Sequence, residues 1–402
     1  MPTPSVAAIR RSVNCRTSLL VMSTILSDPQ AIHDFVTGLA FFGTGGGGGR
    51  LEDGIEMLLP FIRSGDGIPL TAPDELPDDL WTCSVSSIGG RDPDTPPPAQ
   101  ELLSYGLSQE RLTLLERMIA SVRELTAFRG VKIGALVSVE LGSAATVGTI
   151  LAAKALGIPV LDSDYTGRAK PEVVQSKTAM HGKPRTPMAF VDRWGNVSLV
   201  KSAVNDMMAD RLGRHFSMAA YGHGVGACGH LMPLGEVRSA LVRGSLLKAL
   251  PVGEALRLGA QGPDKVAPLK ALTHGGVLFA GKAISTEWED DPPYTFRRFT
   301  YHIQGAGRFA GHACRIWVKN EHHIVWRDEK VVGTSPDLLV VLDAETNRPL
   351  STRGEVTPGR EIVVFGMEPI DPAWHTPRGF ELLGPRHFGF DFDYVPLDPL
   401  KD

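Results

Sequence analysis

The feature that most constrains the fold is a strand–helix–strand pattern in residues 131–172. Two apolar segments, VKIGALVSVE and IPVLDSD, flank LGSAATVGTILAAKALG, which has helical composition and a glycine near each end. This alternation predicts a βαβ unit with parallel strands. Ligands of open α/β sheets bind outside the carboxyl ends of such strands, so a site is expected at this edge.

Acidic residues gather at the ends of both predicted strands. The first strand ends at Glu140, the second ends at Asp162 and Asp164, and GRAKPE then adds Arg168 and Glu172. Carboxylates held together raise one another's pKa, which suits proton transfer; they could also hold a divalent metal or a polar ring. Arg168 could offset the charge through a bidentate pair. The alternative for Asp162 and Asp164 is capping of the following turn.

The composition limits the classes of function. A length of 402 residues makes two domains the default. A net charge of −4 without a long basic block argues against a nucleic-acid partner. The four cysteines lie far apart with no CxxC pair, which indicates a reducing, cytoplasmic location. No run of 18 apolar residues occurs, so no membrane partner is expected.

The chain is predicted to have three parts. Residues 1–22 contain three arginines and no acid, and are predicted to be a disordered or non-native extension, with a targeting segment as the alternative. Residues 23–195 are predicted to form an α/β domain with a partly parallel sheet. Residues 196–402 are predicted to form a helical section followed by a β-rich domain. Helix caps are expected at Ser27 and Ser108, and YGHGVGACGHLMP is expected to be a loop.

Five consecutive glycines, Gly45 to Gly49, follow the first predicted helix. They let a backbone approach a ligand closely and present N–H groups to an anion, so Gly45, Gly46 and Gly47 are candidate substrate-binding residues. No Lys-Ser or Lys-Thr follows and no strand precedes, so the run is not a P-loop. The alternative is a flexible loop between two helices.

Histidine and cysteine offer only a weak metal signal. A loop holds or borders His215, His223, Cys228 and His230, but their spacing matches no compact zinc motif. His322 and His323 are neighbours on a predicted strand and therefore point to opposite faces. A bound divalent metal such as zinc remains an alternative, with unknown ligands. The simpler interpretation is that these histidines are hydrogen-bonded in the core or lie on the surface. Cys314 is expected in the core.

The β-rich half supplies three further candidates. KNEHHI contains Asn320 and Glu321, and Asp337 begins the apolar strand SPDLLVVLD. Glu321 could face the carboxylate edge across a domain cleft, where binding sites often form. Its alternative is an exposed turn residue. No GxSxG elbow is present.

Several sequence motifs together resemble those of a known protein family. GTGGGGG, SVELG, DSDYTGRAKPE, KNEHHI, SPDLLVVLD and WHTPRGFELLGPRHFGFDFDYVPL resemble the S-methyl-thiohydantoin desulfurase family over residues 27–397. The resemblance implies an α/β domain followed by a β-rich domain. It also implies hydrolysis of a five-membered cyclic imide or thioimidate, in which water adds to the carbon bearing sulfur and methanethiol leaves.

The family pattern matches seven positions here: Asp162, Asp164, Arg168, Glu172, Asn320, Glu321 and Asp337. The chain departs from the pattern beside Glu140. Where the family tends to read E-I-G-G-x-N, Ser143 replaces the second glycine and Ala145 replaces the asparagine, and Tyr165-Thr166 stands for Gly-Met. These departures lie beside the expected site, so the substrate could differ from that of other members.

The hypothesis from sequence is a hydrolase for a small, polar, nitrogen-containing ring. Asp164 or Glu172 would be the general base, Glu140 a further catalytic acid, and Arg168 would bind a negative substrate group or orient the base. Glycine-loop amides or a divalent ion would stabilise developing negative charge. The rivals are an ATP-dependent hydantoinase-like ring-opening enzyme and a non-catalytic small-molecule binding or regulatory protein. A homo-oligomer is left open.

Overall fold

The structure is a computed structural model that describes residues 9–14, 21–47, 50–63, 67–89, 97, 99–107, 109–262, 264–292 and 295–399. Within the predicted extension 1–22, residues 9–14 are described as a strand, whereas residues 1–8 and 15–20 lie outside the described ranges. Gly48, Gly49 and the predicted cap Ser108 also lie outside them. None of the described helices is long and apolar enough to cross a bilayer.

Sheet A forms the layer of the amino-terminal domain. Its strand order is β1 (Ile9–Asn14), β2 (Val21–Leu26), β3 (Ile68–Thr71), β6 (Val160–Asp164), β5 (Ala135–Ser138), β4 (Trp81–Ile88), β9 (Val225–Pro233), β7 (Met188–Val191) and β8 (Val197–Val200), with β10 (Val242–Arg243) paired to β6. The pairs β3–β6, β5–β6 and β4–β5 are parallel, and the other pairs are antiparallel. The predicted α/β domain with a partly parallel sheet is confirmed.

The described residues also form α-helices in both domains. They are α1 (Pro29–Phe42), α2 (Leu51–Arg63), α3 (Ala99–Ser104), α4 (Leu114–Arg129), α5 (Ala145–Leu156), α6 (Lys177–Met180), α7 (Asp206–Ala219), α8 (Leu234–Val237), α9 (Ala249–Ala260), α10 (Ala267–Thr273) and α11 (Pro377–Leu383). The βαβ unit predicted from the sequence is β5–α5–β6. Asp28, not Ser27, caps α1 by accepting from the Gln30 N–H. Thr113 caps α4 in a capping box with Glu116.

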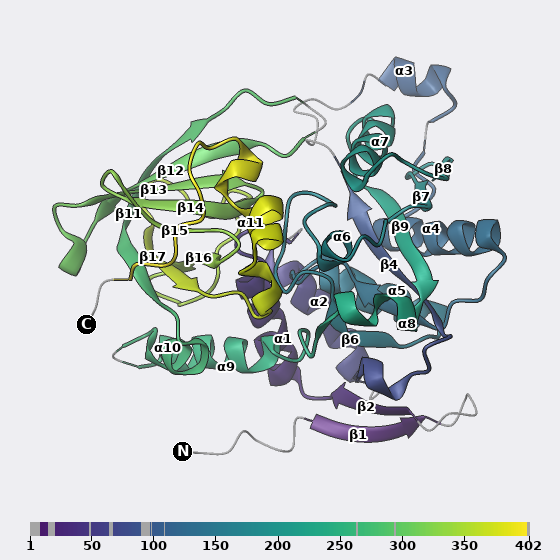
Figure 1. Ribbon diagram of the computed structural model, residues 1–402, viewed down its shortest axis with the longest axis horizontal. Coiled ribbons are helices and arrows are strands. Elements are labelled where there is room, and N and C mark those ends of the chain that lie inside the picture. Colours follow the sequence, from purple (N-terminus) through teal and green to yellow (C-terminus); the bar gives the residue numbers. More distant parts are fainter. Residues whose placement is uncertain are drawn as a thin grey trace.

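Sheet B forms the β-rich carboxyl-terminal domain. Its order is β15 (Lys330–Thr334), β14 (Glu321–Arg327), β13 (Ala313–Lys319), β12 (Arg298–Gly305), β11 (Gly276–Trp288), β17 (Glu361–Met367) and β16 (Leu338–Asp343), and neighbours are antiparallel. This domain was predicted, although β15 was not. In Figure 1 the two sheets lie on opposite sides, and α11 lies between them in that view.

One segment predicted as a loop is a strand. The sequence YGHGVGACGHLMP contributes β9, which pairs with β4 and β7 in the interior of sheet A. Its glycines were read as loop signals, but they are needed for packing. A Cβ on Gly226 would lie 2.2 Å from the carbonyl carbon of Arg117, and one on Gly229 would lie 2.7 Å from the Arg185 side chain.

The two domains share one core. Buried apolar residues of α1, such as Leu39 and Phe41, belong to the same cluster as Val340 and Phe365 of sheet B. The Phe41 and Phe365 ring centroids are 6.1 Å apart. The boundary predicted at residue 195 falls between β7 and β8 of sheet A, so β8, β9 and β10 come after it. Side chains from the two sheets are therefore held in a fixed arrangement at the interface between the two domains, which is called the seam below.

Candidate active site

The glycine loop lies at the seam between the domains. It begins where α1 ends, with the Gly43 N–H donating to the Leu39 carbonyl at 2.8 Å. A Cβ on Gly46 would lie 2.0 Å from Glu321 Oε1, and one on Gly47 would lie 2.7 Å from the Gly142 Cα. The loop therefore touches the start of β14 on one side and the β5–α5 junction on the other. Only glycine fits at these contacts.

Glu321 is the most unusual acid of this region. Its side chain is 0% exposed, and Oε1 accepts a hydrogen bond from Asn320 Nδ2 at 2.5 Å. Oε2 is buried and has no hydrogen-bond partner among the described residues. Burial, followed by the charge of Glu140, raises the pKa of Glu321 to about 8. The raised pKa favours the protonated, neutral form of Glu321 near pH 7.

Glu140 is the acid whose charge, together with burial, raises the pKa of Glu321. It follows β5 and is only partly exposed, and Oε2 accepts the Lys170 backbone N–H at 3.3 Å. Burial raises the pKa of Glu140, while the charges of Lys170, Arg185 and Arg214 oppose that rise. The pKa of Glu140 is raised on balance, with the cationic neighbours limiting that rise, and the charge of Glu140 adds to the burial that favours protonated Glu321. Two carboxyl groups with separated roles are the arrangement that general acid–base catalysis requires.

Arg168 ties the two domains together. Its guanidinium is 1% exposed, and every hydrogen bond it donates ends on an uncharged oxygen. The acceptors are the Ala169, Pro336, Asp337 and His322 carbonyls and Thr44 Oγ1. Burial lowers the pKa of Arg168 to about 10, so it stays charged near Glu321 and Glu140. Because its hydrogen bonds end on oxygens of both domains, the guanidinium acts by holding these segments in position.

Asp162 and Asp164 both accept hydrogen bonds from backbone N–H groups. Asp164 Oδ2 accepts the Thr166 and Gly167 N–H groups at 2.8 and 2.6 Å, and burial raises the pKa of Asp164 to about 6. Asp162 Oδ1 accepts the Leu247 N–H at 2.9 Å. Asp164 therefore caps the turn that follows it, as the alternative interpretation from sequence described, whereas Asp162 binds a backbone N–H of the distant segment before α9.

Glu172 and Asp337 lie in separate polar groups. Glu172 contacts Lys319 Nζ, and its Oε2 lies 2.7 Å from His387 Nε2. Burial would raise the pKa of Glu172, but the His387 hydrogen bond and the Lys319 charge outweigh it and lower the pKa to about 2.

The Asp337 carboxylate lies 2.6 Å from His375 Nε2 and accepts from the Tyr394 hydroxyl at 2.9 Å. Burial raises its pKa to about 6. Neither the Glu172 nor the Asp337 side chain hydrogen-bonds to the described part of the glycine loop, so the candidate site comprises Glu140, Arg168, Asn320, Glu321 and Gly45 to Gly47.

Sequence reasoning missed several charged residues behind Glu140. Lys170 and Arg185 are 8% and 2% exposed, and Asp210 forms an ion pair with Arg214 at 2.8 Å. Lys170 stands inside the GRAKPE motif, so it could have been noted there. Arg185 and Arg214 carry no sequence signal, because α7 and the segment before β7 reach this region only through the fold.

Comparison with known proteins identifies the family. The model described as "S-Me-THD-like, N-terminal domain" matches residues 30–202, and "S-Me-THD-like, C-terminal domain" matches residues 204–397. The chain belongs to the S-Me-THD-like family. This confirms the resemblance found in the sequence and is consistent with a hydantoin-related function and with enzymatic activity.

A solved structure supports the fold of this S-Me-THD-like chain. The X-ray crystal structure of a protein from Chromobacterium violaceum aligns with a TM-score of 0.71 at 20% sequence identity, covering 92% of this chain and 99% of that one. At this identity the likeness concerns the fold alone. No curated protein matches the chain.

The histidines considered as metal ligands have other surroundings. His230 is buried, with Nδ1 2.9 Å from Ser84 Oγ and Nε2 3.1 Å from Thr178 Oγ1. His322 and His323 are both buried, with Nδ1 atoms 3.1 Å from the Leu339 carbonyl and 3.1 Å from Ser335 Oγ. Within the described ranges, no group of three or more His, Cys, Asp or Glu side chains is arranged to hold a metal ion.

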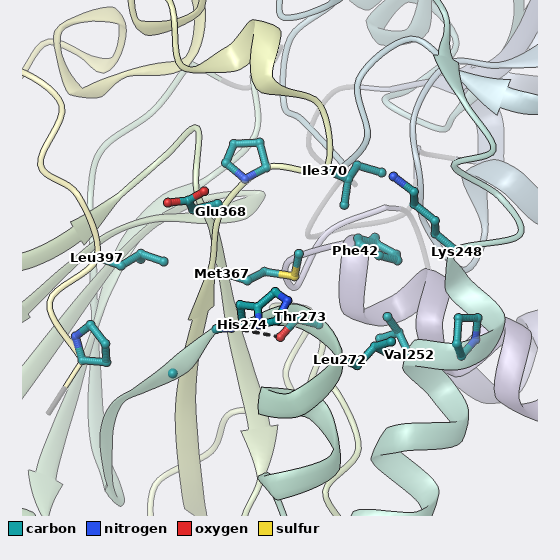
Figure 2. Close-up of a pocket in the computed structure, with 15 residues that line it drawn as sticks. Phe42, Lys248, Val252, Leu272, Thr273, His274, Met367, Glu368, Ile370 and Leu397 are labelled. Carbon is teal, nitrogen blue, oxygen red and sulfur yellow. Dashed lines mark hydrogen bonds between the residues drawn. The ribbon is translucent and has the colours of Figure 1, made fainter. Parts of the chain in front are cut away.

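A cavity of about 620 Å³ lies elsewhere on the seam. Its walls include Phe42 and Val252 from α1 and α9, and Met367 and Ile370 from the end of β17 and beyond (Figure 2). None of the predicted site residues lines it. Phe42 directly precedes the glycine loop, and its carbonyl accepts the Ala169 N–H at 3.1 Å.

Proposed function

We propose that this protein is a hydrolase for a small cyclic imide or thioimidate, such as an S-methyl-thiohydantoin-like ring. Glu140 serves as the general base and Glu321 as the general acid. The observation that supports this most is the buried Glu321 carboxyl, whose Oε2 has no partner among the described residues and whose pKa is raised by burial and by Glu140. Family membership supplies the substrate class.

The two acids can carry every proton of the reaction. Ionised Glu140 takes one proton from water as its oxygen bonds to the ring carbon that bears sulfur, and Glu321 protonates the ring nitrogen of the C=N bond. In the second step the C–S bond breaks, Glu140 returns its proton to the departing sulfur, and Glu321 accepts the hydroxyl proton as the C=O forms. Water and thioimidate thus give hydantoin and methanethiol, and both carboxyl groups regain their starting states.

The glycine loop offers donors for the negative charge that develops in between. The Gly46 N–H is occupied by the Gly43 carbonyl at 2.8 Å. The N–H groups of Gly45 and Gly47 make no hydrogen bond to the described residues. We assign these two amides to substrate binding, and one such donor contributes about 3–4 kcal/mol to catalysis.

This proposal moves the general base away from Asp164 and Glu172. The Asp164 carboxylate is bonded to two backbone N–H groups at a turn, and the pKa of Glu172 lies near 2, which makes it a weak base. The rival source of activated water is a bound zinc or other divalent ion. Elemental analysis of the untreated purified protein tests that rival.

The test is release of methanethiol from an S-methyl-thiohydantoin, followed with a thiol reagent. Glu140→Gln and Glu321→Gln should each lower the rate by about 10²–10⁴-fold. Glu172→Gln is the matched control, because it makes the same change in a carboxylate outside the pair. Equal rates in wild type, E140Q and E321Q would remove the mechanism, and absence of turnover in the wild type would remove the function. A melting shift with ATP but no turnover would favour the nucleotide-dependent alternative.

A further inference from the structure

His322 presents a buried hydrogen-bond acceptor that the described residues do not use. The side chain is 0% exposed, and Nδ1 lies 3.1 Å from the Leu339 carbonyl oxygen. A carbonyl oxygen can only accept a hydrogen bond, so Nδ1 carries the ring hydrogen and Nε2 carries a lone pair. Nε2 is buried and has no hydrogen-bond partner in the described part of the chain. Burial lowers the pKa of His322 to about 4, so the ring is neutral near pH 7 and Nε2 remains an acceptor.

The ring of His322 lies against Gly45 of the glycine loop. A Cβ on Gly45 would lie 2.5 Å from the ring carbon Cε1, the atom to which Nε2 is bonded. The His322 N–H donates to the Thr44 carbonyl at 3.0 Å, and the Thr352 N–H donates to the Gly45 carbonyl at 2.9 Å. These two bonds hold the loop against the ring. Glycine is required at position 45, because a side chain would collide with the imidazole and because φ is +91° there.

Gly45 supplies a donor next to this acceptor. Its backbone N–H makes no hydrogen bond to the described residues. The next loop residue, Gly46, lies against Glu321, since a Cβ there would be 2.0 Å from Glu321 Oε1. A free acceptor and a free donor on two contacting residues therefore lie beside the proposed general acid, which directly precedes His322 in β14.

We propose that His322 Nε2 and the Gly45 N–H bind the amide edge of the substrate ring. The ring N–H donates to Nε2, and the Gly45 N–H donates to the adjacent ring carbonyl oxygen. Cyclic imides carry this edge, and S-methyl-thiohydantoins carry it when the C=N bond uses the other ring nitrogen, the one that Glu321 protonates in the proposed reaction. A carboxylate or phosphate oxygen fits poorly, because it has no hydrogen to give to the lone pair of Nε2.

This inference rests on the proposed function and deepens it. It makes His322 the residue that selects rings in which the nitrogen beside the carbonyl group carries a hydrogen. A site that hydrogen-bonds a substrate N–H discriminates strongly against an analogue that lacks it, because the buried partner is then left unpaired.

The test compares a substrate with its N-methyl analogue. The two S-methyl-thiohydantoins carry either hydrogen or a methyl group on the nitrogen between the carbon bearing sulfur and the carbonyl carbon. In the wild type, the N–H substrate should have a kcat/KM on the order of a hundredfold above that of the N-methyl substrate, because methylation leaves Nε2 without a donor.

Two substitutions separate recognition from the structural role of the ring. Asparagine can still donate to the Leu339 carbonyl but has no acceptor at the Nε2 position, whereas glutamine can place its amide oxygen there and loses the Leu339 bond. The preference should fall by about tenfold or more in His322→Asn and be largely kept in His322→Gln. His323→Asn is the control and should keep the full preference, since both ring nitrogens of His323 already have partners, Ser335 Oγ and the Lys319 carbonyl.

Binding of the product gives a second readout that needs no turnover. Hydantoin should raise the melting temperature of the wild type, and hydantoin methylated at the corresponding nitrogen should not. Equal kcat/KM for the two substrates in the wild type, or an undiminished preference in H322N, overturns the role of His322 and leaves the hydrolase proposal intact. No turnover, combined with a melting shift that hydantoin causes in the wild type but not in H322N, overturns the hydrolase proposal and retains recognition of the ring edge. If H322N does not fold, His322→Phe replaces it, because phenylalanine keeps the ring shape without a nitrogen, and an undiminished preference in that variant overturns the role of His322 equally.

Discussion

Replacing Glu321 with glutamine should change the pH dependence of stability. The pKa of Glu321 is about 8 in the folded protein, against an ordinary value of 4.5. Between these values the folded state keeps a proton that the unfolded state has lost, so the wild type loses stability as pH rises, by up to about 1.4 kcal/mol per pH unit. This loss of stability is absent below pH 4.5 and no longer grows above pH 8. Glutamine has nearly the same shape and does not titrate.

The full span corresponds to about 5 kcal/mol, and relaxation around the buried charge reduces it. We therefore expect the free energy of unfolding of E321Q, minus that of the wild type, to increase by about 2 kcal/mol or more from pH 5 to pH 8. Urea unfolding followed by tryptophan fluorescence at several pH values measures it. A difference that stays constant from pH 5 to pH 9 would refute the raised pKa.

Three other perturbations test neighbouring parts of the account. Gly46→Ala places a methyl group 2.0 Å from Glu321 Oε1, so it should lower stability by about 1–3 kcal/mol and abolish turnover. Gly262→Ala is the control, because its Cβ would meet only ordinary contacts, and it should be nearly neutral in thermal unfolding. Arg168→Lys should destabilise by about 3 kcal/mol in urea, because one amine cannot satisfy five acceptors; an unchanged midpoint would contradict the tie between domains. Glu172→Gln should cost about 3 kcal/mol at pH 7, and that cost should disappear as pH falls from 4.5 to 2, since the pKa of Glu172 is lowered to about 2.

The sequence predicted the two-domain architecture and named several residues of the candidate site. The β5–α5–β6 unit was predictable because apolar period, helical composition and glycine ends all agreed. Asn320 and Glu321 were found through the KNEHHI motif. The strand β9 was missed, because Gly226 and Gly229 serve close packing there, and glycine in isolation indicates a loop.

The roles of the acids could not be predicted, because they depend on partners distant in the chain. Asp164 and Glu172 looked like bases in the sequence, yet one caps a turn and the other pairs with Lys319 and His387. Arg214 of α7 donates to the Pro171 carbonyl only because the fold brings these distant segments together. Such a site is defined by which charges lack a partner, and a single sequence does not contain that information.

The central claim is that Glu140 and Glu321 act as a base and an acid at the seam of the two domains. The most direct test is the pH profile of kcat/KM for a neutral S-methyl-thiohydantoin in the wild type. The account predicts a bell whose falling limb has an apparent pKa near 8, the value of Glu321. Activity that stays level or keeps rising from pH 7 to pH 10 would contradict it.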